Sequence, residues 1–151
     1  MPAGKPTVMR DALSELIRRE SRRTRGELIH GVTVDAYLDK VLALGETLVH
    51  LQGERLVGAL FGYCNAPDSG LAYVSLLIVA EETRGQGIGD MLVEAFIRLS
   101  ARRGFARVQL EVQASNHAAV SLYNKHGFFR IGEEGPKLLM QRNLPGRHMK
   151  S

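Results

Sequence analysis

One stretch, Val74 to Phe96, constrains this chain more than any other. It consists of an apolar segment ending at Val79, a short acidic link, a loop with glycines at alternate positions, and an amphipathic segment. A strand that enters a glycine-rich turn at the start of a helix forms an anion site, because the first N–H groups of a helix have no partner within it. Arg84 adds a positive charge at the mouth of this loop. The stretch therefore predicts a cradle for a pyrophosphate group.

The loop does not by itself identify the ligand. It reads R-x-x-G-x-G from Arg84 to Gly89. It is not the dinucleotide-binding fingerprint G-x-G-x-x-G, because the residue three positions after Gly87 is Asp90. It is not a P-loop, because no Gly-Lys-Ser/Thr follows. An ordinary turn between a strand and a helix remains the alternative reading.

Length and charge narrow the classes of protein. A chain of 151 residues predicts a single domain, here residues 1–151, with a core over about 8–144, a loose arm over 1–6 and a tail over 145–151. The formal net charge of +4 favours an anionic ligand, but it is below the charge density of a nucleic-acid binder. We therefore expect no nucleic-acid partner.

Cysteine, histidine and hydropathy patterns argue against several other classes. The single cysteine, Cys64, excludes an internal disulfide, and its place late in an apolar strand favours an inert core thiol. The five histidines show no metal-ligand spacing, so we expect no metal. The sequence has no signal-peptide pattern and no run of about 18 apolar residues, which predicts a cytoplasmic protein without a membrane span.

Hydrophobic periodicity predicts the secondary structure. The expected order is helix 8–22, a helix that starts at Thr33 or Asp35 and ends before Gly45, strands 47–51, 56–64 and 73–79, helix 87–103, strand 107–112, helix 116–126, and strands 128–132 and 137–143. Gly58 and Gly62 in the second strand leave room for close packing or mark a bulge.

This order predicts a mixed α/β sheet with helices on its faces. Parallel pairing is expected across the helices that begin near residues 87 and 116, and antiparallel pairing within the hairpins. The continuously apolar strand 73–79 is expected to be covered on both faces. The helix after the loop should pack through an apolar stripe made of Met91, Leu92, Ala95, Phe96 and Leu99.

A second motif makes the first one specific. The segment Asn116 to Phe128 reads N-x-x-A-x-x-L-Y-x-x-x-G-F. Together with R-x-x-G-x-G, it resembles the GNAT superfamily of N-acetyltransferases over roughly residues 48–144. The resemblance implies a three-layer α/β/α fold with a splayed central sheet, and acetyl-CoA as cosubstrate. The family usually opens with a strand, but residues 1–7 are short and proline-rich, so we expect the first strand to be missing.

The resemblance also implies roles for the residues of the two motifs. The pyrophosphate of CoA would be held by backbone N–H groups of Arg84, Gly85, Gln86, Gly87, Ile88 and Gly89. The backbone of Leu77, Ile78 and Val79 would pair with the pantetheine arm in the gap between two splayed strands. Asn116 would reach the pantetheine or its surroundings.

Two residues are candidates for the chemistry. In the family a tyrosine at the place of Tyr123 commonly faces the CoA sulfur, and a phenol with a pKa near 10 can protonate a departing thiolate. The alternative is a tyrosine that packs in the core with its hydroxyl bonded to the backbone. For direct transfer in a ternary complex, Tyr123 is the expected acid.

Glu111 is the candidate base. By two-residue alternation it shares one face of its strand with Gln109 and Gln113, a polar row that a water-lined cleft would explain. The pattern Leu110-Glu111-Val112 resembles members that acetylate protein N-termini, where a glutamate here is a base. The alternatives are a carboxylate paired with a neighbouring arginine or capping the next helix, and proton removal by water.

The acceptor stays open between three hypotheses. The first is a primary amine of a small molecule or amino sugar, the second a protein N-terminus or lysine, and the third a CoA-binding regulatory module without turnover. Five arginines between Arg18 and Arg25 form either a solvated helix face or a site for an acidic acceptor, such as a nucleotide-linked sugar, with His30 and Tyr37 nearby. The final hairpin is compatible with pairing across a homodimer.

Overall fold

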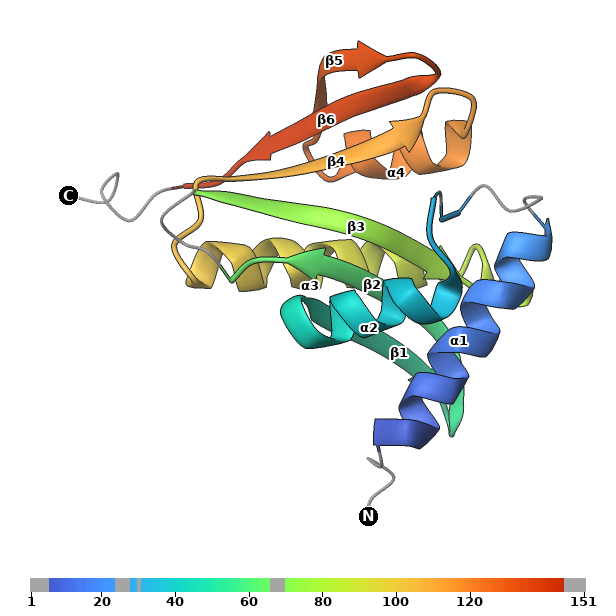
Figure 1. The fold of residues 1–151 in the computed structure, drawn as a ribbon. Helices are drawn as coiled ribbons and strands as arrows, with labels where there is room; N and C mark the ends of the chain where they lie inside the picture. The colour runs from blue at the N-terminus through green and yellow to red at the C-terminus, as the bar shows by residue number, and fades with distance from the viewer. Residues whose placement is uncertain (1–5, 24–27, 30, 66–69, 146–151) are drawn as a thin grey trace.

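The computed structural model describes residues 6–23, 28–29, 31–65 and 70–145. They form a mixed sheet of strand order β1-β2-β3-β4-β6-β5 with helices on its faces (Figure 1). The elements are α1 (Pro6–Arg23), α2 (Val34–Leu44), β1 (Glu46–Gln52), β2 (Arg55–Tyr63), β3 (Leu71–Val79), the 3-10 turn η3 (Glu81–Thr83), α3 (Ile88–Arg102), β4 (Arg107–Gln113), α4 (His117–Lys125), β5 (Phe129–Glu134) and β6 (Lys137–Asn143). The predicted order of helices and strands is confirmed.

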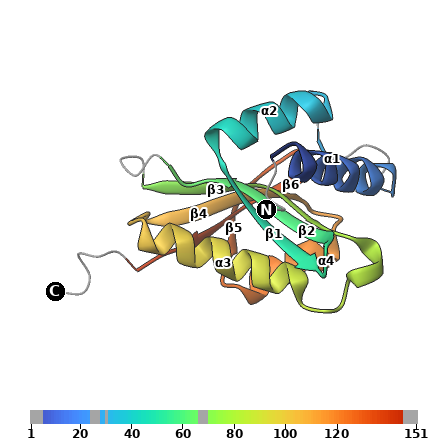
Figure 2. The ribbon, with the colours of Figure 1, turned by 90° about the horizontal axis from the view of Figure 1, so that it is seen from below.

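The elements lie in three layers. Helices α1 and α2 cover one face of the sheet, and α3 and α4 cover the other (Figure 2). Thr33 caps α2 by accepting a hydrogen bond from the Ala36 N–H at 3.0 Å, as one of the two predicted caps. The prediction that the family's first strand is missing concerns residues 1–7, of which residues 1–5 lie outside the described residues and Pro6 and Thr7 belong to α1.

The pairing of the last strands differs from the prediction. β3 and β4 pair in parallel across α3, as expected. β5 does not pair with β4, because β6 lies between them and is antiparallel to both. Buried Met140 of β6 lies opposite buried Leu110 of β4, so the more apolar strand of the final hairpin takes the inner position. The prediction of parallel pairing across the helix near residue 116 is therefore wrong.

The sheet splays between β3 and β4. Parallel pairing joins only Leu71–Val74 to Arg107–Leu110, and the rest of β3 pairs with β2 alone. The register of β2 and β3 also shifts here, because Phe61 pairs with Leu76 while Gly62 pairs with Val74. This irregularity opens a gap between the ends of β3 and β4.

The two faces of β3 are buried to different degrees. Its side chains alternate between buried and half-buried along the whole strand. The predicted cover is therefore complete on one face and partial on the other.

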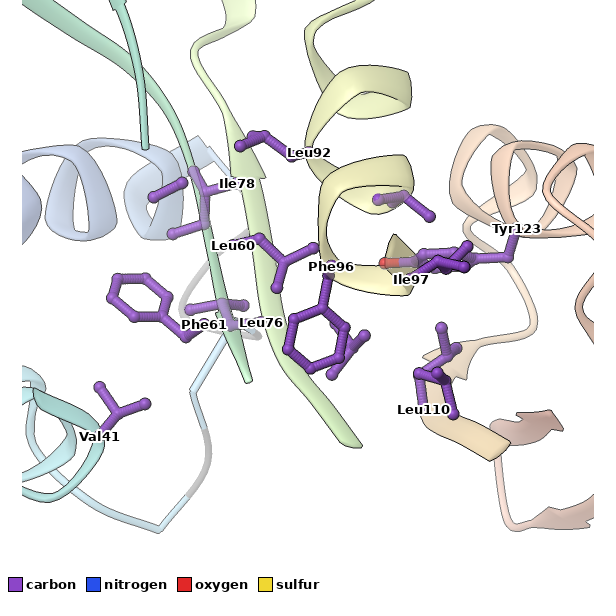
Figure 3. Packing of buried hydrophobic residues seen from close by; sticks show 14 of the residues in the cluster. Val41, Leu60, Phe61, Leu76, Ile78, Leu92, Phe96, Ile97, Leu110 and Tyr123 are labelled. Atoms are coloured by element: carbon purple, nitrogen blue, oxygen red, sulfur yellow. The ribbon is translucent and has the colours of Figure 1, made fainter. Parts of the chain in front are cut away.

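Helix α3 packs closely on β2 through two glycines. A Cβ atom at Gly58 would lie 2.7 Å from the Ile88 side chain, and one at Gly62 would lie 2.6 Å from the ring of Phe96. The predicted close packing at these glycines is confirmed. Figure 3 shows Leu92 and Phe96 facing the β2–β3 region in this core.

The buried face of α3 differs in part from the predicted stripe. Met91 is 49% exposed and Ala95 is exposed, whereas Val93 and Ile97 are buried. Tyr123 extends from α4 toward the same core (Figure 3). The buried face of α3 is thus rotated from the predicted stripe toward Val93 and Ile97.

Candidate active site

The glycine loop carries a run of unpaired N–H groups. Helix α3 begins its hydrogen bonding with the Met91 N–H, which donates to the Gly87 carbonyl at 3.0 Å. Within the described part of the chain, the N–H groups from Gly85 to Asp90 have no acceptor. Gly85 and Gly87 have φ of 86° and 81°, in the left-handed region that favours glycine, and a Cβ atom at either would contact nothing within 4 Å. The loop therefore has the open space and the free N–H donors that an anion cradle needs.

A cavity of about 590 Å³ extends from this cradle along the end of β3. Its lining is formed by α1, the end of β3, the loop and the start of α4. It includes these predicted cofactor-binding residues: Leu77, Ile78, Val79, Arg84, Gly85, Gly87, Ile88, Gly89 and Asn116. Two predicted residues do not line it. One is Tyr123, and the other is Gln86, whose side chain instead accepts a hydrogen bond from Gln52 at 2.7 Å.

A second cavity of about 210 Å³, here called the gap cavity, lies where β3 and β4 part. It shares Leu28, Leu77, Asn116 and Ala119 with the first cavity. The two cavities therefore form one groove that runs from the cradle into the sheet. Both candidate catalytic residues, Tyr123 and Glu111, line the gap cavity.

The direction of the peptide groups on β3 follows from its pairing with β2. The Ala80 N–H donates to the Val57 carbonyl at 2.8 Å, and Ile78 pairs with Ala59. Because peptide groups alternate along an antiparallel strand, Ile78 also directs its N–H and C=O toward β2. The backbone groups of Leu77 and Val79 point the other way, toward the gap.

Tyr123 is buried but has no hydrogen-bond partner among the described residues. It is 6% exposed, and its ring packs edge-on against Phe128 with centroids 5.7 Å apart. Figure 3 shows its side chain extending from α4 toward the centre of the molecule. Burial raises the pKa of Tyr123 above its ordinary value, so the phenol stays neutral near neutral pH. It is a proton donor whose hydroxyl is not bonded to the backbone.

Glu111 stands on the predicted polar face of β4, but it is not deeply buried. Its side chain is 40% exposed, and Lys137 approaches it at 3.8 Å. An ion pair with an arginine was the alternative for this residue, and the partner in the structure is instead a lysine. Tyr73 lies near it across the gap: burial raises the pKa of Tyr73, and the charge of Glu111 adds to the effect.

Asn116 caps helix α4. Its side-chain oxygen accepts a hydrogen bond from the Ala119 N–H at 3.1 Å. The cap places Asn116 at the junction of both cavities, where its amide nitrogen has no partner among the described residues.

A carboxylate next to the cradle is paired with a lysine and a histidine. Asp90 lies in the first turn of α3, where it lines the cavity of about 590 Å³. His126 and Lys125 at the end of α4 approach it at 2.9 and 3.0 Å. The hydrogen bond with His126, then that with Lys125, holds the pKa of Asp90 below its usual value. These pairs offset a negative charge that would otherwise oppose an anion in the cradle.

The arginine cluster is held in ion pairs. Arg18 lies 3.5 Å from Asp35, Arg19 lies 3.5 Å from Glu82, and Arg22 lies 3.9 Å from Glu15. Arg23 lies 3.3 Å from Glu20. Arg25 and His30 lie outside the described residues.

Tyr37 is linked to the gap indirectly. Its hydroxyl is hydrogen-bonded to Ser75, a residue of the gap cavity, at 2.7 Å. Burial raises the pKa of Tyr37 to about 12. Its ring packs edge-on against Phe61, so Tyr37 supports β3 at the register shift.

Sequence reasoning missed Glu20. It is 1% exposed, and its carboxylate lies against Arg84 at the mouth of the cradle. The sequence contains a sign of this burial, because Glu20 continues the buried stripe of Leu13, Leu16 and Ile17 at helical spacing. Glutamate is almost never fully buried unless it is paired.

The described residues contain neither a membrane-spanning helix nor a metal-binding cluster. None of their helices combines the length and apolar character needed to cross a membrane. No group of three or more histidine, cysteine, aspartate or glutamate side chains among them is arranged to hold a metal ion.

The sequence matches the model of a protein family. The model of the acetyltransferase (GNAT) family matches residues 11–128. Among curated proteins, the chain is 31% identical to N-alpha-acetyltransferase 30 of Schizosaccharomyces pombe over 56% of this chain and 57% of that protein. It is 38% identical to a mycothiol acetyltransferase of Corynebacterium efficiens over 50% of this chain and 25% of that protein. The chain thus spans about half or less of the length of these relatives.

Solved structures share the fold. A PaiA N-acetyltransferase from Thermoplasma acidophilum in complex with coenzyme A matches with a TM-score of 0.73 and 18% identity, over 89% of this chain and 92% of that one. The ribosomal-protein-S18-alanine N-acetyltransferase of Escherichia coli matches with a TM-score of 0.72 and 19% identity, over 93% of this chain and 92% of that one. At these identities the likeness shows a common fold, the predicted splayed three-layer architecture.

Proposed function

Because the chain belongs to the GNAT acetyltransferase family, we propose that it is an enzyme that transfers the acetyl group of acetyl-CoA to a primary amine. The observation that carries the proposal is the continuous groove. It joins a cradle of unpaired N–H groups to a gap in the sheet that holds an unpartnered, neutral phenol. A CoA-binding module without turnover would need the cradle but not the phenol.

In this proposal the groove binds acetyl-CoA along its length. N–H groups from Gly85 to Gly89 hold the pyrophosphate, and the helix dipole of α3 favours its negative charge. Arg84 contributes its guanidinium rather than its N–H, which is bonded to the Glu81 carbonyl. The strand segment from Leu77 to Val79 lies beside the pantetheine arm. Leu77 offers its N–H and carbonyl to the arm and Val79 its N–H, while Ile78 contributes through its place in the lining. Asn116 offers its amide nitrogen at the bend between the two cavities.

The chemistry is acyl transfer in a ternary complex. The amine nitrogen attacks the thioester carbonyl carbon, a C–N bond forms, and the C–S bond breaks. The N–H of Leu77 is the donor near Ile78 that faces the gap, and it stabilises the developing oxyanion. Tyr123 gives its proton to the departing thiolate, and Glu111, or water that it orders, takes the proton from the amine.

Cys64 plays no part in this transfer. It is 1% exposed, and burial raises the pKa of its thiol. Neither cavity of the groove includes it in its lining. The proposal therefore needs no acyl-enzyme.

The acceptor side favours a cation. Beyond Glu111, a cavity of about 350 Å³ adjoins the gap cavity and is lined also by Glu133 and Glu134, with Lys137 as its cation. The described arginines of the α1 cluster are engaged with carboxylates, which weakens the hypothesis of an acidic, nucleotide-linked acceptor. We therefore favour a small amine that carries further positive charge, because charge complementarity selects and steers such a molecule.

A protein N-terminus is the second candidate. Relatives named for this activity include N-alpha-acetyltransferase 30 of Schizosaccharomyces pombe and a putative ribosomal protein bS18-alanine N-acetyltransferase of Bacillus subtilis, the latter 36% identical over 46% of this chain. The polar row of β4 with Glu111 agrees with this candidate.

An acceptor panel tests the proposal. Release of CoA from acetyl-CoA, followed with the thiol reagent DTNB, is measured with di- and polyamines, amino sugars, nucleotide-linked amino sugars and short peptides with free N-termini. We expect the highest kcat/KM for an amine with a second positive charge. A preference for the nucleotide-linked acceptors would overturn the assigned charge of the site. CoA binding without release on any amine would favour the non-catalytic module.

The proposed base has its own prediction. Glu111→Gln is expected to lower kcat/KM at least tenfold, with the largest loss below neutral pH, where least of the amine is already deprotonated. The measurement is kcat/KM between pH 6 and 9. Glu54→Gln, in the exposed β1–β2 turn, is the control and should behave as wild type. A variant with lower rates but the wild-type pH profile would instead assign proton removal to water.

A further inference from the structure

We propose that Glu20 is a positioning residue for CoA binding. Its buried carboxylate on α1 holds the link between β3 and the glycine loop, residues 81–84, in the shape that the cradle requires. This inference rests on the proposed function, because it takes the cradle to be the CoA site.

Both oxygens of the carboxylate are directed to this link. Oε1 accepts a hydrogen bond from the Arg84 Nη2 at 2.9 Å, and Oε2 accepts one from the Glu81 N–H at 3.3 Å. Glu20 thus contacts the first and the last residue of the link. Charge-assisted hydrogen bonds of this kind are stronger than neutral ones, and burial reduces their competition with water.

The link is the last segment with backbone hydrogen bonds of its own before the glycine loop. Within it, Thr83 N–H donates to the Ala80 carbonyl at 3.0 Å, and Arg84 N–H donates to the Glu81 carbonyl at 3.2 Å. The glycine loop that follows is held by no backbone bond of its own N–H groups within the described residues until helix α3 begins. A fixed link reduces the entropy that the loop loses when it closes on a ligand.

Glu20 also fixes the guanidinium of Arg84. The Arg84 Nε donates to the Val79 carbonyl at 3.3 Å, so the side chain bridges the end of β3 and the buried carboxylate. Its charge is thereby held beside the cofactor cavity, whose lining includes Glu20 itself. A guanidinium can serve two acceptors at once, which an ammonium group does poorly at fixed geometry.

The neighbours of Glu20 complete a clasp between α1 and the link. Arg19 pairs with Glu82, and Arg23 pairs with both Glu81 and Glu20. This clasp gives the arginine cluster a structural role at the cofactor end of the groove.

Two variants test the role of Glu20. Glu20→Gln keeps the size of the side chain and removes its charge; we expect the Kd for CoA, from isothermal titration calorimetry, to rise about tenfold. At saturating acetyl-CoA, kcat should stay within twofold of wild type. Arg84→Lys keeps the charge at the mouth but loses the two-acceptor geometry, and it should raise the Kd several-fold. Because Arg84 is exposed, this variant does not depend on tolerance of the buried site.

The control is Glu15→Gln, on the same helix but with a side chain that is 68% exposed, and it should bind CoA as wild type. Wild-type affinity in both Glu20→Gln and Arg84→Lys would overturn the inference. So would a lower melting temperature of Glu20→Gln with unchanged Kd, or a loss of kcat with unchanged Kd. A wild-type chain that does not bind CoA would overturn the proposed function itself, which separates the two failures.

Discussion

A glutamate in place of Gly87 is expected to raise the Kd for CoA more than a hundredfold. The backbone at this position has φ of 81°, which costs a residue with a Cβ about 1–2 kcal/mol. The new carboxylate would stand among N–H groups that are proposed to bind a pyrophosphate, and like-charge juxtaposition costs several kcal/mol more. A hundredfold change in Kd corresponds to about 2.7 kcal/mol, and the two costs together exceed this value.

Calorimetric titration with CoA measures the effect, and the chain offers a matched control. Gly104 has φ of 85° at the other end of α3, and a Cβ there would also contact nothing within 4 Å. Gly104→Glu introduces the same strain and the same charge away from the groove, so it should bind CoA as wild type. If Gly87→Glu still bound CoA tightly, the pyrophosphate would have to lie elsewhere.

Tyr123→Phe is expected to lower kcat about a hundredfold while the Kd for CoA stays within twofold. General acid catalysis by a positioned side chain typically contributes 10²–10⁴-fold. Phenylalanine retains the edge-on contact with Phe128 and removes only the hydroxyl, which has no hydrogen-bond partner among the described residues. Steady-state release of CoA and calorimetry with CoA measure the two quantities. Tyr63→Phe, on β2 outside the groove lining, is the matched control and should keep kcat within twofold.

The raised pKa of Tyr123 also predicts how kcat depends on pH. A general acid works in its protonated form, and a pKa above the ordinary value keeps it protonated to higher pH. Wild-type kcat should therefore show no decline from Tyr123 as the pH rises toward about 10, the ordinary pKa of a phenol. Unchanged kcat in Tyr123→Phe would remove it as the acid.

The sequence predicted those parts of the fold that depend on local pattern. The order of elements, the glycine-rich start of α3 and the Thr33 cap follow from periodicity and capping within a few residues. The insertion of β6 between β4 and β5 does not, because it depends on which strand of a hairpin is more apolar when it meets Leu110. The burial of Val93 and Ile97 in place of Met91 and Ala95 likewise does not follow from the periodicity of α3 alone.

The candidate site shows the same division. The loop and Tyr123 could be placed from the motifs, because each motif fixes its own backbone. The exposure of Glu111 could not, since it depends on Lys137 across the sheet. The partners of the arginine cluster were missed because Glu81 and Glu82 come together with α1 only in the folded chain.

The short junction between β3 and β4 makes the ligand part of the architecture. In the described part of the chain, the sheet halves pair through Leu71–Val74 and Arg107–Leu110, and past this junction the peptide groups of Leu77 face the gap without a strand partner. With the pantetheine arm in that space, the cosubstrate acts as a missing strand, and each molecule bound adds its binding free energy to folding. The melting temperature of this protein would then rise with the acetyl-CoA concentration. A low acetyl-CoA concentration would lower the stability of the protein as well as the rate of the proposed reaction.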